Sequence, residues 1–239
     1  MSKTVQKYRF LIFILVILSI SKIDFRFKDE LTCCSDDFDY FIHAETIIED
    51  FDFDYSNQLK GFENERFFKN NKSAPIGFVG TGLYSAPFML VGTVFDKIFS
   101  SVGLKSQDSI ISYKLLFYSF SSIFYLFFTA RYLKESLREL NIKFKVLDLI
   151  ILLLGVGISY YAFERYSMTH VYEAFSLTML IYFSIKFYQN KDKPSAIFIP
   201  IFAVIGFSVK WVHFYFFIIP LIIKFLFFSK KESRLIDIK

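Results

Sequence analysis

The stretch IISYKLLFYSFSSIFYLFFTARY, residues 110–132, decides the fold class of this chain. It is a nearly continuous run of apolar and aromatic residues, and it is as long as the ~20 residues that a helix needs to cross a bilayer. Basic residues follow at once, because residues 131–145 hold five bases and two acids. Positively charged loops stay on the cytoplasmic side, so the run predicts a transmembrane helix that ends inside the cell.

The composition supports the same interpretation. The chain is 54% hydrophobic, with 34 Phe and 15 Tyr, and its mean hydropathy is +0.41. A soluble domain is usually ~45–50% apolar. Lipid is therefore the expected solvent for much of the surface, and the sequence predicts an all-α integral membrane protein whose single transmembrane domain covers residues 1–239.

Working outward from residues 110–132, other apolar runs alternate with charged loops. The predicted spans cover residues 8–23, 110–132, 146–163, 171–188, 195–209 and 212–228. This polytopic bundle of about six transmembrane helices puts both termini in the cytoplasm, which satisfies the charge rule for a multi-pass protein of the plasma or inner membrane. The alternative for the first run is a signal peptide, since Ser19 and Ser21 offer a small-residue cleavage site.

The long first loop, residues 24–109, is expected on the outer face. Its part 24–72 holds thirteen acidic and six basic residues, a net charge of −7, which argues against nucleic acid as a partner. Segment 82–103 is apolar but contains Pro87 and Asp96. A span there would invert the basic loop, so we expect an interfacial or re-entrant helix.

Within this loop, SDDFDYFIHAE at residues 35–45 predicts a helix that begins near the membrane surface. Ser35 is a suitable N-cap, and Asp36 and Asp37 fall in the first turn, where the helix dipole favours negative charge. Asp36, Tyr40, His43 and Ile47 would share one face. A carboxylate there could deprotonate a hydroxyl or hold a cation. The alternative is ordinary helix capping in a polar loop.

The order of these segments resembles the start of a GT-C type membrane glycosyltransferase. The closest branch is the superfamily of protein mannosyltransferases and aminoarabinose transferases, whose first outer loop carries an acidic Asp-Asp/Glu-x-x-Tyr motif. Asp36, Asp37 and Tyr40 match that motif. Further matches are APIG at 74–77, YSAPF at 84–88, the pair Thr169-His170 and the Gly206-to-Lys210 hairpin.

The resemblance implies an inverting transfer of a sugar from a polyprenyl-phosphate donor to an acceptor that the sequence leaves unidentified. Asp36 would be the base, with Asp37 as its neighbour or as the base itself, and Tyr40 would complete the motif at the substrate. Cations must stabilise the departing phosphate. The candidates are Lys72, Arg165, His170 and Lys210. Some branches use a divalent metal, but the closest one generally does not, so neither a metal nor another cofactor is expected.

Each cation has a structural alternative. Lys72 lies in a polar loop and could simply be solvated, Arg165 could pair with Glu164, and His170 could be a hydrogen-bonding residue at a helix start. Lys210 lies between two apolar runs, where an unpaired charge is costly, which favours a function. His213, three residues later, could share its face.

The chain departs from the family in length, because members have more than ten spans. The resemblance therefore predicts the N-terminal part of such an enzyme, to which a second chain could supply further helices. Two other functions stay open: a non-catalytic membrane subunit or scaffold, and a small transporter with an acidic outer vestibule. A transporter would be expected to show an internal repeat, and the sequence has none.

Overall fold

The computed structural model describes residues 35–60, 67–69, 72–103 and 112–229. The predicted first span 8–23, the possible cleavage site and Cys33 and Cys34 lie outside them. The described part is mostly helical, which confirms the all-α prediction at that level. Its strands are the two-residue pairs β1 (Phe68–Lys69) and β2 (Lys72–Ser73), which form one antiparallel hairpin.

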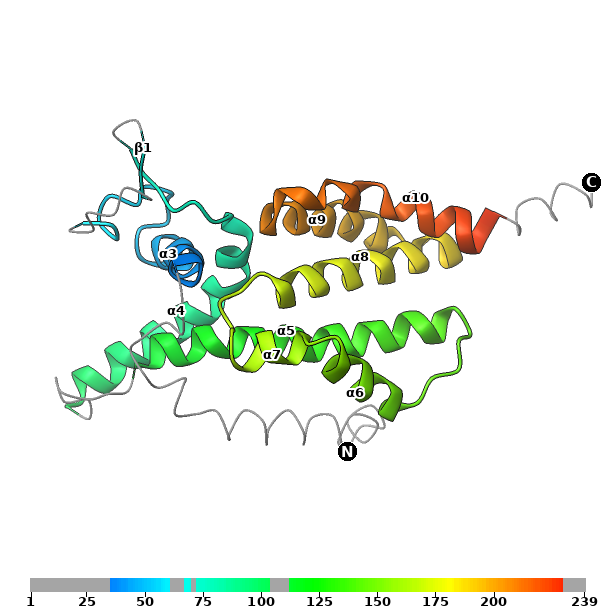
Figure 1. The fold of residues 1–239 in the computed structure, drawn as a ribbon, viewed down its shortest axis with the longest axis horizontal. Coiled ribbons are helices and arrows are strands. Elements are labelled where there is room, and N and C mark those ends of the chain that lie inside the picture. The colour runs from blue at the N-terminus through cyan, green and yellow to red at the C-terminus, as the bar shows by residue number, and fades with distance from the viewer. Residues whose placement is uncertain (1–34, 61–66, 70–71, 104–111, 230–239) are drawn as a thin grey trace, which may run out of the picture.

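Long helices dominate the structure (Figure 1). In chain order the elements are α3 (Ser35–Glu49), α4 (Val79–Ser101), α5 (Tyr113–Glu139), α6 (Val146–Gly155), α7 (Ile158–Phe163), α8 (His170–Asn190), α9 (Lys193–Val209), the 3-10 helix η2 (Trp211–Phe217), α10 (Ile219–Ile223) and the π-helix η3 (Lys224–Phe228). Helix α8 packs between α5 and α9, whereas α4 packs against α3 and α5. Helix α3 and the hairpin gather at one end, where α8 begins and α9 ends (Figure 1).

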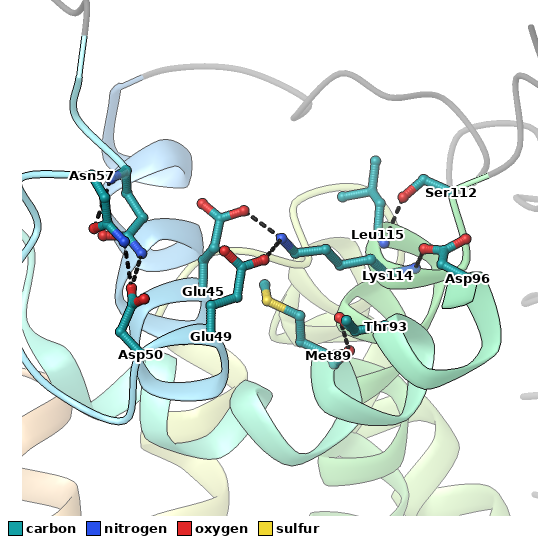
Figure 2. A network of polar contacts seen from close by, with 11 residues as sticks. Glu45, Glu49, Asp50, Asn57, Met89, Thr93, Asp96, Ser112, Lys114 and Leu115 are labelled. Carbon is teal, nitrogen blue, oxygen red and sulfur yellow. Dashed lines mark hydrogen bonds and ion pairs between the residues drawn. The ribbon is translucent and has the colours of Figure 1, made fainter. Parts of the chain in front are cut away.

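The start of α5 is fixed from the neighbouring helix α4. The Ser112 hydroxyl accepts a hydrogen bond from Leu115 N at 3.2 Å, and the Asp96 carboxylate accepts from the backbone N–H groups of Tyr113 and Lys114 at 3.2 and 2.9 Å. The Lys114 ammonium reaches back to Glu45 and Glu49 of α3 (Figure 2). Three helices are thus tied together by polar contacts that satisfy the first turn of α5.

Two predicted spans are not continuous helices. Residues 146–163 divide into α6 and α7, because Gly157 adopts a left-handed conformation (φ 72°) that ends one helix and starts the next. Residues 212–228 divide into η2, α10 and η3. Each of the two predicted ranges is therefore built from shorter helices, and whether they cross a membrane stays a prediction. Helix α5 also continues past the predicted end at residue 132 to Glu139, so that Lys134 and Arg138 lie on the helix rather than in a following loop.

Helices α8 and α9 occupy almost the same ranges as the predicted spans 171–188 and 195–209. Asp192 caps α9 by accepting a hydrogen bond from Ser195 N at 3.1 Å, and Lys191 ends α8 in a left-handed conformation. In the described part of the chain, no one helix has both the length and the hydropathy for a membrane crossing. The bent pair Trp211–Phe217 and Ile219–Phe228 reaches that standard only when joined across its 40° bend.

Segment 82–103 forms most of α4, a helix with two environments. Its first half is buried, including Thr81, Tyr84 and Met89, whereas apolar side chains such as Val94 and Ile98 in the second half are exposed. The buried half packs into the rest of the protein and the exposed half extends past it (Figure 1). The fold thus uses α4 both as a core helix and as an apolar outer element.

Candidate functional site

A tightly hydrogen-bonded unit, which we call the α3 clasp, consists of Asp39, His43, Tyr55 and Gly77. The Gly77 N–H donates to Asp39 Oδ2 at 2.9 Å, and one turn later His43 Nε2 donates to the Gly77 carbonyl at 2.8 Å. Because a carbonyl can only accept, Nε2 carries the proton and Nδ1 accepts from the Tyr55 hydroxyl at 2.8 Å. One residue of the loop before α4 is thus held at both its N–H and its C=O.

Burial sets the ionisation of the clasp. Asp39 and His43 are 0% and 5% exposed. Burial is the main cause that lowers the pKa of His43, and it also raises the pKa of Tyr55 to about 12, with a smaller contribution from Asp52. Both groups are therefore neutral near pH 7, as the hydrogen bonds between them require.

The two acids of the first turn of α3 differ in environment. Asp36 is exposed, whereas Asp37 is fully buried. Asp37 Oδ2 lies 3.5 Å from Arg165 Nη2, whose side chain is 21% exposed. Arg165 belongs to the turn between α7 and α8, so this pair links the acidic helix to the start of α8. The predicted shared face of α3 therefore divides, because Asp36 is exposed while Tyr40 and His43 are buried.

A second charged group surrounds Glu173 on the first turn of α8. We call it the Glu173 cluster, and it consists of His170, Glu173, Lys210, His213 and Tyr215. Glu173 Oε2 lies 3.3 Å from His213 Nε2 and 3.7 Å from His170 Nδ1, and Oε1 lies 3.9 Å from Lys210 Nζ. His213 Nδ1 is 2.9 Å from the Tyr215 hydroxyl. Three basic side chains therefore face one carboxylate.

The local backbone explains how the cluster forms. Helix α9 stops at Val209, and Lys210 is extended (φ −162°, ψ 124°) before η2 begins. His213 has non-helical angles inside η2 (φ −81°, ψ 21°), and it stacks on Phe216 with ring centroids 4.8 Å apart. The break turns Lys210 and His213 toward the first turn of α8. If α9 continued without a break, both residues would point in other directions.

Helix α4 brings the clasp and the cluster to the same end of the bundle. A Cβ atom on Gly80 would collide with the backbone of Ser208 and Val209, directly before Lys210. A Cβ atom on Gly82 would lie 2.9 Å from Ala44 N on α3. The first turn of α4 is thus wedged between α3 and the end of α9, and only residues without a side chain fit there.

The predicted site residues are brought together in two sets. Asp37 meets Arg165, and His170 and Lys210 both face Glu173. The Tyr40 ring is buried against Gly77. Lys72 contributes its backbone to β2, but its side chain lies outside the described part of the chain. The expected sharing of a face by Lys210 and His213 is realised at Glu173.

Sequence reasoning missed Glu173 and Tyr215 as members of a site, and it gave Asp39 no role. The spacing His170-x-x-Glu173 was a usable signal, because residues three apart share a helix face. Tyr215 gave none, since it lies in an aromatic run typical of lipid contact. In the part of the chain that is described, no group of three or more His, Cys, Asp or Glu side chains is arranged to hold a metal ion.

Comparison of the chain with protein-family models, with curated proteins and with solved structures gave no match.

Proposed function

We propose that this chain is a membrane-embedded glycosyltransferase that moves a sugar from a polyprenyl-phosphate donor to an acceptor at the outer face. The single observation that carries the proposal is that the acidic helix α3 pairs with Arg165 at the end of the bundle where two further predicted cations, His170 and Lys210, face one carboxylate of α8. Asp37 lies 3.5 Å from Arg165, and His170 and Lys210 face the same carboxylate.

The distribution of polarity supports a membrane setting. Small hydroxyl residues are buried where α5 meets α7 and α8, among them Ser121, Ser122 and Ser176, and each donates a hydrogen bond to a backbone carbonyl. Large apolar residues point outward instead, including Ile151 at 60% and Phe225 at 74% exposure. Small residues at helix contacts and bulky apolar residues outside are typical of helices packed in lipid.

The two acids receive different roles. Asp36 is exposed at the start of α3, so an acceptor hydroxyl can reach it, and we assign it as the general base. Asp37 is buried beside Arg165, so we assign it to hold the guanidinium. Arg165, His170 and Lys210 are 21%, 41% and 42% exposed, which leaves each of them accessible to the donor phosphate. Tyr40 remains a proposed substrate-binding residue on the motif alone, and Lys72 remains one as a predicted cation for the phosphate.

The reaction then follows from the charges. Asp36 takes the proton of the acceptor hydroxyl. At the same time the acceptor oxygen attacks the anomeric carbon from the face opposite the phosphate. The bond between that carbon and the phosphate oxygen breaks, so the configuration inverts and the phosphate gains a negative charge. Cations fixed beside that oxygen stabilise the transition state more than the ground state, which is what accelerates a reaction.

Transfer of radiolabelled sugar from lipid donors in membranes that contain the protein tests the proposal. We expect Asp36→Asn to lower the rate by about 100-fold or more at an unchanged protein level, since a general base contributes 10²–10⁴-fold. Asp52→Asn is the matched control, because Asn keeps the Oδ1 atom that accepts from Asp54 N at 3.0 Å. This control should retain transfer.

Two outcomes contradict the proposal. If Asp36→Asn transfers as fast as the control, Asp36 is not the base. If neither the wild-type chain nor its variants raise transfer above that of membranes without the protein, the chain is a non-catalytic membrane subunit, the alternative that the sequence also allows.

A further inference from the structure

The Glu173 cluster contains a chain of polar contacts that has no role in the sugar transfer itself. It runs from the Glu173 carboxylate to His213 Nε2 at 3.3 Å, and from His213 Nδ1 to the Tyr215 hydroxyl at 2.9 Å. The order carboxylate, imidazole, hydroxyl is the arrangement by which acid–base enzymes orient a histidine and connect it to a reacting oxygen.

Glu173 decides which ring nitrogen of His213 carries the proton in the neutral form. The contact of 3.3 Å between His213 Nε2 and Glu173 Oε2 is an ion-pair contact and not a hydrogen bond, and the negative charge of the carboxylate favours the proton on Nε2, the nitrogen that faces it. Nδ1 then accepts from Tyr215. A second proton on the ring can bind only at Nδ1, where the Tyr215 oxygen accepts it. Proton exchange is thereby confined to the Tyr215 side of the ring.

Burial separates the inner and outer ends of this chain. The His213 side chain is 10% exposed and that of Glu173 is 16% exposed, whereas Tyr215 is 42% exposed. Glu173 Oε1 and His213 Nε2 make no hydrogen bond. The imidazole itself is therefore shielded, and the Tyr215 hydroxyl is the atom through which it can exchange a proton with a bound substrate.

A second histidine of the same chain shows what a structural version of this contact is like. His43 also meets a tyrosine hydroxyl through Nδ1, at 2.8 Å from Tyr55. Its Nε2, however, donates to the Gly77 carbonyl, which carries no charge to stabilise an imidazolium. His213 has the Glu173 carboxylate in that place, with Lys210 and His170 on the same carboxylate.

We infer that Glu173, His213 and Tyr215 form a proton relay that supplies a proton to a phosphate monoester at this end of the bundle. The identity of that monoester, the polyprenyl phosphate released after sugar transfer, rests on the proposed function. Glu173 is the positioning residue, and Tyr215 is the group that touches the phosphate.

The relay balances without another reactant. Cleavage of the sugar–phosphate bond leaves a phosphate monoester with two negative charges. The Tyr215 O–H proton moves to a phosphate oxygen while the Nδ1–H proton of the His213 imidazolium moves to the Tyr215 oxygen. The products are a monoester with one negative charge, an intact Tyr215 hydroxyl and a neutral imidazole, and Glu173 stays ionised throughout. A phosphate with less charge is held less tightly by Lys210 and His170, which favours its release.

Nitrogen NMR of the full chain labelled at histidine tests the relay, because the chain has only three histidines. The wild-type protein in lipid nanodiscs should show His213 with the proton on Nε2 at pH 8, and Glu173→Gln should give a mixture of the two tautomers. The His43 signal should stay on Nε2 in both proteins, because its partners are in the α3 clasp, and it reports that each variant is folded.

Binding of citronellyl phosphate, a short lipid phosphate monoester, provides the second measurement. Tyr215→Phe should weaken binding about tenfold, the loss expected for one hydrogen bond to a charged group. Glu173→Gln should change it less than about threefold, because Lys210 keeps its charge. The relay is overturned if wild-type His213 carries its neutral proton on Nδ1, if Glu173→Gln leaves the tautomer unchanged, or if Tyr215→Phe binds the probe as the wild type does. No measurement here requires sugar transfer, so a failure of the proposed function is seen separately, in the Asp36→Asn assay.

Discussion

The α3 clasp and the Glu173 cluster each place a histidine between a tyrosine hydroxyl and a second partner, yet their geometries differ. In the clasp, both His43 nitrogens make contacts of 2.8 Å and the ring is 5% exposed. In the cluster, the contacts around Glu173 range from 3.3 to 3.9 Å, and Lys210 is 42% exposed. Short contacts to neutral partners fix a fold, whereas longer contacts among charges leave room for a ligand to enter.

The largest expected effect comes from disrupting the contact between α4 and the end of α9, which connects the α3 clasp to the Glu173 cluster. Gly80→Val would place a branched side chain against the backbone of Ser208 and Val209, which cannot move without displacing Lys210. Overpacking costs about 1–3 kcal/mol even where side chains can adjust, and rigid backbone raises that cost. We expect loss of folded protein, measured as the fraction that remains monodisperse after detergent extraction.

A matched control for this variant is Gly155→Ala, at the end of α6, where an added Cβ meets nothing within 4 Å. Replacing a helical glycine by alanine should leave the folded fraction unchanged or raise it. If Gly80→Val extracts as well as Gly155→Ala, the clasp and the cluster are not coupled through α4.

Replacing His43 and His213 one at a time tests whether the clasp contributes more to stability than the cluster. His43→Gln should lower the free energy of unfolding by about 2–3 kcal/mol, because it leaves buried partners of the clasp without their hydrogen bonds. His213→Gln should cost less than about 1 kcal/mol, since the 3.3 Å contact of His213 with Glu173 is not a hydrogen bond and its other partner, Tyr215, is 42% exposed. Denaturant unfolding in mixed micelles measures both. A larger loss of stability for His213→Gln would show that the cluster, and not the clasp, is the unit that stabilises the fold.

The clasp should also make stability depend on pH. Burial holds the folded-state pKa of His43 below its ordinary value of 6.5, so the fold favours the neutral ring. The unfolded chain then binds the proton first, and stability is fully present above about pH 6.5 and is lost as the pH falls below it. Thermal unfolding between pH 8 and 5 should show this decrease in the wild type and a smaller one in His43→Gln. Equal slopes would remove His43 as the cause.

The pair Asp37 and Arg165 links the clasp side to the cluster side through the turn before α8. A double-mutant cycle with Asp37→Asn and Arg165→Gln should give a coupling energy of about 1 kcal/mol, because the 3.5 Å contact is long but one partner is fully buried. The four proteins are compared by denaturant midpoint. Additive effects of the two substitutions would mean that the pair does not connect the two units.

The smallest effect is expected in the acidic loop beside the clasp. Hydrogen bonds from Asn57 and Gln58 lower the pKa of Asp50, which is otherwise exposed. Asp50→Asn should leave the unfolding midpoint within experimental error, because water replaces both contacts. A clear destabilisation would show that the loop belongs to the clasp rather than merely following it.

Much of the helical architecture follows from the sequence alone. Apolar runs and charged loops predicted the ranges of α8 and α9 almost to the residue, and the acidic first turn of α3 was expected from helix capping. The breaks within and between helices were harder to predict. The helix end at Gly157 depends on a positive φ that many glycines do not adopt. Helix α9 ends before Lys210, and no glycine or proline stands at that point in the sequence to predict the end.

The candidate site was predictable in its members more than in its contacts. Arg165, His170 and Lys210 were singled out as cations for the phosphate that the resemblance implies, but nothing in the sequence paired Arg165 with Asp37 across 128 residues. Glu173 was overlooked because an acid in the first turn of a helix has an ordinary capping role. Its importance depends on Lys210 and His213, which approach only because α9 breaks.

By itself, the sequence determined that this protein is helical, that an acidic helix begins near residue 35, and that its cations stand at the edges of apolar segments. Those properties are local, since they depend on residue type and on spacing within one or two helical turns. Only the tertiary structure decided which acid is exposed, which histidine makes its hydrogen bonds to neutral partners and which lies against Glu173. These outcomes depend on how close α3, α4, α8 and α9 approach one another, and that distance is fixed by glycines and helix breaks acting between segments far apart in the chain.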